Sequence, residues 1–294
     1  MKPLDPDVIA WAAQLACVLE VSANKPGNVT PTTGFSDMTA LDFMASALAI
    51  GPAMREAPRS GLGRTIRRAV DDTRRFVTAN TNLGIVLLLA PLAKAAGTAH
   101  PGRLRSAVGD VLGNLTAEDR RQAFAAIRKA SPGGLGRADT MDVNDLDAGG
   151  TLLEAMVEAR GRDSVAREYA TRFQITFGTG YPCLDQLWGE GHALSDAIVQ
   201  TALTILARVP DTLIVRKEGW ETAEEVSARA RDVLDKGGAL SEEGKKALAH
   251  LDGDLRGEGH RLNPGTTADL TTASLFIFLA EQGPQSIPKV VRRW

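Results

Sequence analysis

The sequence predicts an all-α protein that folds as a single large multi-helix bundle, and three observations lead to this prediction. Apolar residues recur at helical spacing in successive stretches along the 294 residues. Helix start signals precede several of these stretches. Strand signals are thin, because aromatic residues make up 5% of the chain and only the run Thr212 to Val215 is typical of a strand.

The first helix is predicted to begin after Asp5 and to end near Ser22. Asp5 can cap the helix, and Pro6 occupies its first position, where proline is favoured. The apolar residues that then recur at helical spacing are Val8, Ile9, Trp11, Ala12, Leu15, Ala16, Val18 and Leu19.

Three capping-box patterns mark the starts of further helices. They are Thr39-x-x-Asp42, Thr116-x-x-Asp119 and Thr266-x-x-Asp269, with aspartate in place of the usual Glu or Gln. Apolar periodicity predicts the other helices. Their ranges are Thr65–Val77, Leu83–Ala95, Leu104–Leu112, Leu152–Ala159, Val165–Phe177, Leu194–Arg208, Thr222–Leu234 and Glu242–Leu255.

Two helices should form the centre of the bundle. Leu83–Ala95 and Leu270–Leu279 are apolar on nearly all sides, as expected for helices buried within a large bundle. The loops carry Gly and Pro, and none is long and simple enough to divide the chain, so residues 1–294 are predicted to form one domain. The expected loops are Asn24–Asp37, Ser131–Gly150, Gly178–Pro182, Pro210–Gly219 and Glu258–Thr267.

The composition excludes several function classes. The formal net charge is -2, so no global positive field draws the protein to nucleic acid or to an anionic membrane. Only Cys17 and Cys183 are present, which supports neither a disulfide framework nor a cysteine zinc site. The longest apolar run, Leu83 to Ala93, is too short to span a bilayer. We expect a cytoplasmic protein that binds small molecules.

A cation and an amide follow the first helix directly. Lys25 and Asn28 lie in a loop shaped by Pro26 and Gly27, which suits an anionic or sugar ligand and is also common in ordinary helix-terminating turns. Glu20 lies in the last turn of the helix, where the dipole disfavours a carboxylate. It should therefore point at solvent or be compensated by a cation or metal.

Asparagines stand at the start of the most apolar helix. Asn80 and Asn82 precede Leu83, where free backbone N–H groups and the positive end of the helix favour an anion. The same side chains can simply cap the helix.

Two cations follow the short apolar run that begins after Asp211. Arg216 and Lys217 could clamp phosphates or could pair with Glu218 and Glu221 at the surface.

A second carboxylate opens the last apolar helix. Asn263 and Thr266 lead into Asp269, and a carboxylate within an apolar helix needs a partner. Thr266 can act as a structural cap, but the neighbouring Pro-Gly turn favours a loop that faces a ligand.

Taken in order, these segments resemble the triphosphoribosyl-dephospho-CoA synthases, which make the prosthetic-group precursor of citrate lyase and malonate decarboxylase. They span nearly the whole chain at loop positions between predicted helices. The matching segments are Glu20-Val21-Ser22, Lys25-Pro26-Gly27, Asp37-Met38, Asn80-Thr81-Asn82-Leu83-Gly84, Asp211-Thr212 with Arg216, and Asn263-Pro264-Gly265 through Asp269.

The resemblance implies an all-helical fold and a Mg-ATP donor. An acceptor hydroxyl would attack the anomeric carbon of the ATP ribose, adenine would leave, and the triphosphate would be retained. A single inverting displacement through an oxocarbenium-like transition state is the economical mechanism. A nearby carboxylate would stabilise such a cation.

The resemblance also implies roles for the matching residues. The candidate catalytic carboxylates are Glu20, Asp37, Asp211 and Asp269, of which Glu20, Asp37 and Asp269 are candidate Mg²⁺ ligands and Asp211 and Asp269 candidate general bases. The contacts to ATP that it implies are Lys25, Asn28, Asn82, Arg216 and Asn263. The residue patterns described above add Asn80, Lys217 and Thr266 as candidate contacts.

The sequence departs from the family pattern at two places. It has Asn82-Leu83 where a His-Lys pair is usual, and Lys217-Glu218-Gly219 where Gly-Gly follows the arginine. These departures predict a divergent branch that keeps the ATP donor and changes the acceptor, for which a methanopterin-type pterin precursor is one alternative. A Mg-dependent nucleotide hydrolase or phosphotransferase on a helical bundle is another. The chain could also pair as a homodimer.

Overall fold

The computed structural model describes residues 3–100, 102–133, 136, 140–145, 149–283, 285 and 287–294. Within these ranges the chain forms helices and loops without a strand, and one isolated antiparallel bridge joins Thr30 and Thr33. The all-α prediction is confirmed. The α-helices are α1 Pro6–Ser22, α2 Ala40–Ala49, α3 Gly51–Glu56, α4 Leu62–Thr73, α5 Leu83–Ala96, α6 Leu104–Gly113, α7 Ala117–Ala130, α8 Leu152–Ala159, α9 Ser164–Thr171, α10 Tyr181–Gly189, α11 Leu194–Arg208, α12 Thr212–Glu218, α13 Trp220–Asp235, α14 Glu242–Leu255, α15 Gly265–Gln282 and α16 Ile287–Arg292.

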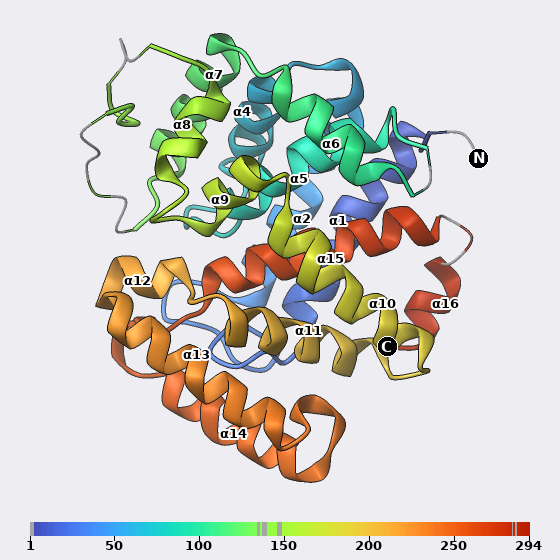
Figure 1. Cartoon of the computed structure of the whole chain (residues 1–294), viewed down its shortest axis with the longest axis vertical. Coiled ribbons are helices and arrows are strands. Elements are labelled where there is room, and N and C mark those ends of the chain that lie inside the picture. The colour runs from blue at the N-terminus through green and yellow to red at the C-terminus, as the bar shows by residue number, and fades with distance from the viewer. Residues whose placement is uncertain are drawn as a thin grey trace.

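Helix α15 crosses the middle of the molecule between two groups of helices (Figure 1). Helices α4 and α6 to α9 lie on one side of it, and α12 to α14 lie on the other. Helix α15 packs against α1, α5 and α11, and both α5 and α15 are buried along almost their whole length. The two apolar helices therefore form the centre of the bundle, as the sequence predicts.

The expected strand Thr212 to Val215 is wrong, because these residues form most of α12. The Asp211 carboxylate accepts hydrogen bonds from the backbone N–H groups of Leu213 and Ile214, which starts a helix. No described segment offers this run a neighbouring strand, and β-branched residues need such a partner for their strand preference to matter.

The predicted helix Val165–Phe177 is also wrong beyond α9. Arg172 and Phe173 adopt left-handed backbone conformations, with φ of 53° and 58°. The buried Glu168 carboxylate accepts hydrogen bonds from the N–H groups of Ile175 and Thr176 after this reversal. The chain then forms a π-helix, Thr176–Gly180, which continues into α10 where the sequence indicates a loop.

Proline lies inside the central helix α5 without leaving a backbone carbonyl unpaired. Pro91 has no N–H, so it cannot donate to the carbonyl of Leu87, four residues earlier. The buried hydroxyl of Tyr169 in α9 donates to this carbonyl instead, at 2.6 Å. A side chain from another helix thus supplies the missing hydrogen bond and links α9 to α5.

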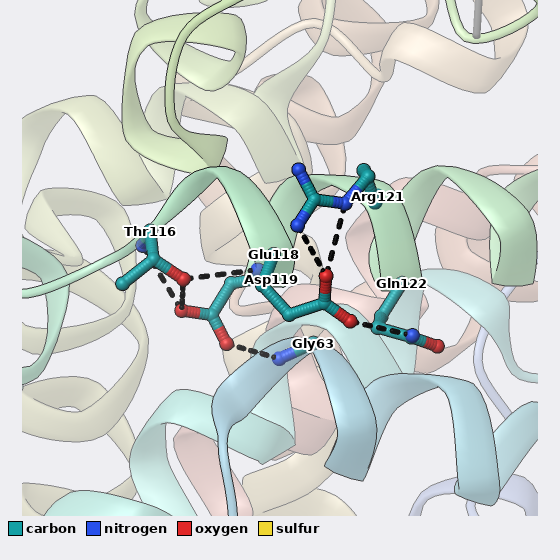
Figure 2. A network of polar contacts seen from close by, with 6 residues as sticks. All are labelled: Gly63, Thr116, Glu118, Asp119, Arg121 and Gln122. Atoms are coloured by element: carbon teal, nitrogen blue, oxygen red, sulfur yellow. Dashed lines mark hydrogen bonds and ion pairs between the residues drawn. The ribbon is translucent and has the colours of Figure 1, made fainter.

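Helix α7 starts with a capping box that also holds α4 (Figure 2). Asp119 Oδ2 accepts from the backbone N–H and the hydroxyl of Thr116, whose hydroxyl oxygen accepts from the Asp119 N–H. Asp119 Oδ1 accepts from the N–H of Gly63 in α4, at 2.8 Å. A methyl group at position 63 would lie 2.3 Å from the backbone oxygen of Asp119, so only glycine permits this approach.

We expect Asp119→Ala to lower the free energy of unfolding by about 2 kcal/mol, because both the cap and the bond to Gly63 are lost. Urea unfolding at equilibrium measures this change. Asp42→Ala is the matched control, because Asp42 forms the same capping box with Thr39 and, among the described residues, its carboxylate makes no bond to another helix. This control should lose about 1 kcal/mol. Equal losses would mean that the bond to Gly63 adds nothing.

Among the described residues, no single helix has the length and apolar composition needed to cross a membrane. Helices α11 and α12 meet that test only when taken together, and they are bent by 54° relative to each other.

Candidate active site

A cavity of about 880 Å³ lies where segments distant in the sequence meet. Its walls come from the end of α1 with the following loop, the turn at 78–84, helices α7 to α9, α12, and the start of α15. Such a volume is in the range of pockets that hold a nucleotide-sized ligand.

The structure brings most of the predicted site residues to this cavity. Lys25 and Asp211 do not line it, and both are buried behind its wall. The predicted residues that line it are Glu20, Asn28, Asp37, Asn80, Asn82, Arg216, Lys217, Asn263, Thr266 and Asp269.

Lys25 compensates Glu20 at the end of α1. The Lys25 Nζ atom lies 3.0 Å from Glu20 Oε1, and both side chains are at most 4% exposed. The ammonium also donates to the backbone carbonyls of Glu20 and Ala23. The cation that the sequence requires for Glu20 is therefore Lys25, and the carboxylate borders the cavity.

Asp211 joins the starts of two helices. Its Oδ1 caps α12, and its Oδ2 accepts from the backbone N–H of Thr267 at 2.6 Å and from the Thr267 hydroxyl at 2.8 Å. Burial raises the pKa of this carboxyl, and the bonds from Thr267, Ile214 and Leu213 oppose that shift. Four donors occupy its two oxygens, so Asp211 has a structural role beside the cavity.

We expect Asp211→Asn to lower the free energy of unfolding by about 2 to 3 kcal/mol, because an amide nitrogen would face N–H donors on one side. Thermal unfolding measures the loss. Asp5→Asn is the matched control, since Asp5 caps α1 by accepting one bond from Asp7 and an asparagine oxygen can replace it. A variant as stable as the control would show that the four donors find other partners.

The predicted capping box at Thr266 is wrong, because α15 begins at Gly265 and Thr266 is already its second residue. Asp211 supplies the side-chain acceptor for the first turn of α15 in place of Thr266. Asp269 then lies beyond this first turn and takes no part in capping.

Asp269 is partly buried, lines the cavity, and accepts no hydrogen bond from the described residues. Burial raises the pKa of its carboxyl well above the ordinary value. The nearby negative charges of Asp211, Glu20 and Asp163 add to this rise, and Arg216 opposes it. A carboxyl with a raised pKa that faces a cavity is a candidate for taking up and releasing a proton.

The asparagines have different surroundings in the cavity wall. Asn28 Nδ2 donates to Asn263 Oδ1 at 3.1 Å, which joins the loop after α1 to the loop before α15. Asn80 Oδ1 accepts from the Leu83 N–H and so caps α5. Asn82 Nδ2 donates to the Thr73 hydroxyl at 3.0 Å.

Cations from three helices or their ends border the cavity. Arg216 Nη1 lies 2.6 Å from Asp163 Oδ2, and Lys217 Nζ donates to the backbone carbonyl of His260 at 3.1 Å. Burial lowers the pKa of Lys217. Arg74 and Arg162 also line the cavity, and sequence reasoning missed both. Such a group can neutralise a polyphosphate.

Apolar side chains form two further parts of the wall. One group, from α1, the loop after it and α2, consists of Val21, Val29, Phe35, Met38 and Phe43. The other, from α7, the segment at 141–143 and α8, consists of Phe124, Ile127, Met141, Val143 and Met156. Flat or apolar parts of a ligand can bind beside the polar centre.

Asp163 is a site residue that sequence reasoning missed. Its Oδ1 caps α9 by accepting from the Ala166 N–H, while Oδ2 holds Arg216. The signal was an aspartate followed by Ser164 at the start of an apolar-periodic stretch, which is typical of an N-cap.

The described residues contain no group of three or more His, Cys, Asp or Glu side chains that could hold a metal ion. The predicted carboxylates therefore do not form an all-protein metal site there. The roles of Glu20, Asp37 and Asp269 as Mg²⁺ ligands stay a prediction.

Comparisons with known proteins agree on one family. The family model of ATP:dephospho-CoA triphosphoribosyl transferase matches residues 6–287. A protein from Malonomonas rubra assigned as a 2-(5''-triphosphoribosyl)-3'-dephosphocoenzyme-A synthase is 25% identical over 94% of this chain and 90% of its own. One from Vibrio cholerae with the same assignment is 27% identical over 93% of this chain and 88% of its own. The crystal structure of an Archaeoglobus fulgidus protein assigned as a triphosphoribosyl-dephospho-CoA synthase superposes with a TM-score of 0.64, at 27% identity, over 81% of this chain and 98% of that one.

Proposed function

Because the chain belongs to the ATP:dephospho-CoA triphosphoribosyl transferase family, we propose that it moves the 5-triphosphoribosyl group of ATP onto a hydroxyl of dephospho-CoA and releases adenine. The observation that carries this proposal is the cavity, where carboxylates, amides and cations from distant segments line one space. Glycosyl transfer from ATP needs negative charge near the ribose and positive charge near the triphosphate.

The bonds that form and break in this reaction require three groups of residues, which stabilise the ribose cation, bind the triphosphate and hold ribose or phosphate oxygens. The acceptor oxygen bonds to the anomeric carbon as the bond from that carbon to adenine breaks, and the electron pair leaves with adenine. The Glu20 carboxylate supports the positive charge that develops on the ribose. Arg216 and Lys217 bind the triphosphate, with Asn28 and Asn263 on ribose or phosphate oxygens.

Asp269 takes the proton of the acceptor hydroxyl. Its carboxyl faces the cavity without a hydrogen-bond donor from the described residues, and its raised pKa makes it a stronger base than an ordinary aspartate. Adenine gains one proton as it leaves, which balances the proton that the hydroxyl loses. Asp211 is not given this role, because four donors occupy its oxygens.

Magnesium would arrive with the triphosphate. Asp37 is exposed at the cavity and Glu20 borders it, so these two carboxylates would complete the coordination. The ion would neutralise part of the triphosphate charge when bound. The proposal also locates the enzyme in the cytoplasm, where ATP is available.

The test is incubation of the protein with Mg-ATP and dephospho-CoA, followed by chromatography of free adenine. Release of adenine that depends on dephospho-CoA is the expected result. A second incubation offers a pterin precursor, because Asn82 and Lys217 stand where the sequence departs from the family pattern. Release of adenine with the pterin precursor but not with dephospho-CoA would assign the pterin as the acceptor. ADP or phosphate as the product would instead indicate nucleotide hydrolysis or phosphoryl transfer.

A further inference from the structure

The carboxyl group of Asp269 lies directly over Gly84, at the second residue of α5. A methyl group at position 84 would lie 2.0 Å from Asp269 Oδ2, 2.5 Å from Cγ and 3.0 Å from Oδ1. All three atoms of the carboxyl group therefore occupy the space that any other side chain at position 84 would need. Helices α5 and α15 pack against each other in the centre of the bundle.

The backbone conformation does not explain the glycine. Gly84 has no positive φ, and the helical backbone there accepts any L-residue. Glycine inside a helix costs about 1 kcal/mol relative to alanine. The remaining explanation is steric, because a side chain at position 84 would clash with its neighbours. The three atoms nearest to a Cβ at this position all belong to the Asp269 side chain.

We propose that Gly84 is a positioning residue. Because it has no side chain, it leaves free the space in which the Asp269 carboxylate lies and from which that carboxylate faces the cavity. The role given to Asp269 rests on the proposed function, whereas the steric relation between the two residues stands without it. The three atoms nearest to an alanine methyl group at position 84 all belong to the Asp269 side chain, which can give way by rotating. The Asp269 side chain would rotate to another conformation and carry its carboxylate away from the reacting hydroxyl.

This proposal predicts how Gly84→Ala and Asp269→Ala combine. Gly84→Ala should lower kcat by about 100-fold, the size of effect expected when a catalytic group is displaced by about 1 Å, and should leave the Kd for ATP within about twofold. In the Asp269→Ala background, the same change should have no further effect on kcat, because Gly84 acts through Asp269.

Thermal unfolding gives a readout that needs no activity. Gly84→Ala should lower Tm by about 3 °C in the otherwise unchanged protein, because the carboxyl must leave its place. In the Asp269→Ala background it should raise Tm by about 2 °C, since the space is free and alanine favours the helix. The matched control is Gly253→Ala in α14, where a methyl group meets nothing within 4 Å. It should shift Tm equally in both backgrounds.

A change of sign in the Tm shift, together with the loss of kcat, supports the proposal. The same Tm shift from Gly84→Ala in both backgrounds would overturn it, because the space would then serve a different neighbour. A full kcat in Gly84→Ala would overturn it as well. Absence of adenine release from the unchanged protein would instead reject the proposed function, and the Tm comparison would still decide the steric relation.

Discussion

Asp269→Asn should lower kcat for adenine release by about 10²- to 10⁴-fold, the usual contribution of a general base. Asparagine keeps the shape of the side chain and cannot take the proton of the acceptor hydroxyl. The affinity for ATP should stay within a few-fold, because the proposed phosphate contacts lie on α12 and the loops around it. Single-turnover measurements of adenine, with ATP binding followed separately, test this result.

The pH dependence of kcat gives an independent check of the same residue. Burial and neighbouring carboxylates raise the pKa of Asp269, so the base is protonated over a wider range of acid pH than an ordinary aspartate. The rate should therefore fall as pH drops through this raised pKa and should level off above it. Asp269→Asn should remove this dependence. An unchanged profile in the variant would assign the base to another group.

Glu20→Gln should lower the free energy of unfolding by about 3 kcal/mol, because it leaves the Lys25 ammonium buried without a counter-charge. The two backbone carbonyls that accept from Lys25 remain, which places the loss at the lower end of the range for broken buried pairs. Urea unfolding measures this change. The paired variant Glu20→Gln with Lys25→Met removes both charges and should recover most of the stability.

The surface pair of Arg55 and Asp7 is the matched control for this prediction. Both side chains are about half exposed, so Arg55→Ala should cost less than about 1 kcal/mol. The paired variant at positions 20 and 25 should stay inactive although it is stable, since Glu20 borders the cavity. Recovery of activity together with stability would show that Glu20 serves the fold alone.

Helix positions and the two central helices could be predicted from the sequence because apolar periodicity is a local signal. The bounds of α8, α11 and α14 agree with the predicted ranges for this reason. Local propensity predicts a strand at Thr212. The residues form a helix instead, because Asp211 caps its first turn and the described residues offer no strand for pairing.

Contacts between distant segments were beyond the reach of the sequence. Loop motifs indicated Glu20 and Lys25 as separate ligand contacts, whereas the fold pairs them with each other and leaves only Glu20 at the cavity. Asp211 and Asp269 looked alike in the sequence, and only the four donors on Asp211 separate their roles. The role of Gly84 could not be predicted from its neighbours in the sequence, because the group that requires a glycine there, the Asp269 carboxyl, lies on another helix.

The hydrogen bond from Tyr169 to the carbonyl of Leu87 has a consequence for ligand affinity. Helix α9 contributes Val165 and Ala166 to the cavity, and α5 contributes Leu87 itself. The bond between these helices therefore joins two parts of the cavity wall from inside the core. Because these parts are held together before a ligand binds, binding loses little conformational entropy there, and more of the contact energy remains as affinity.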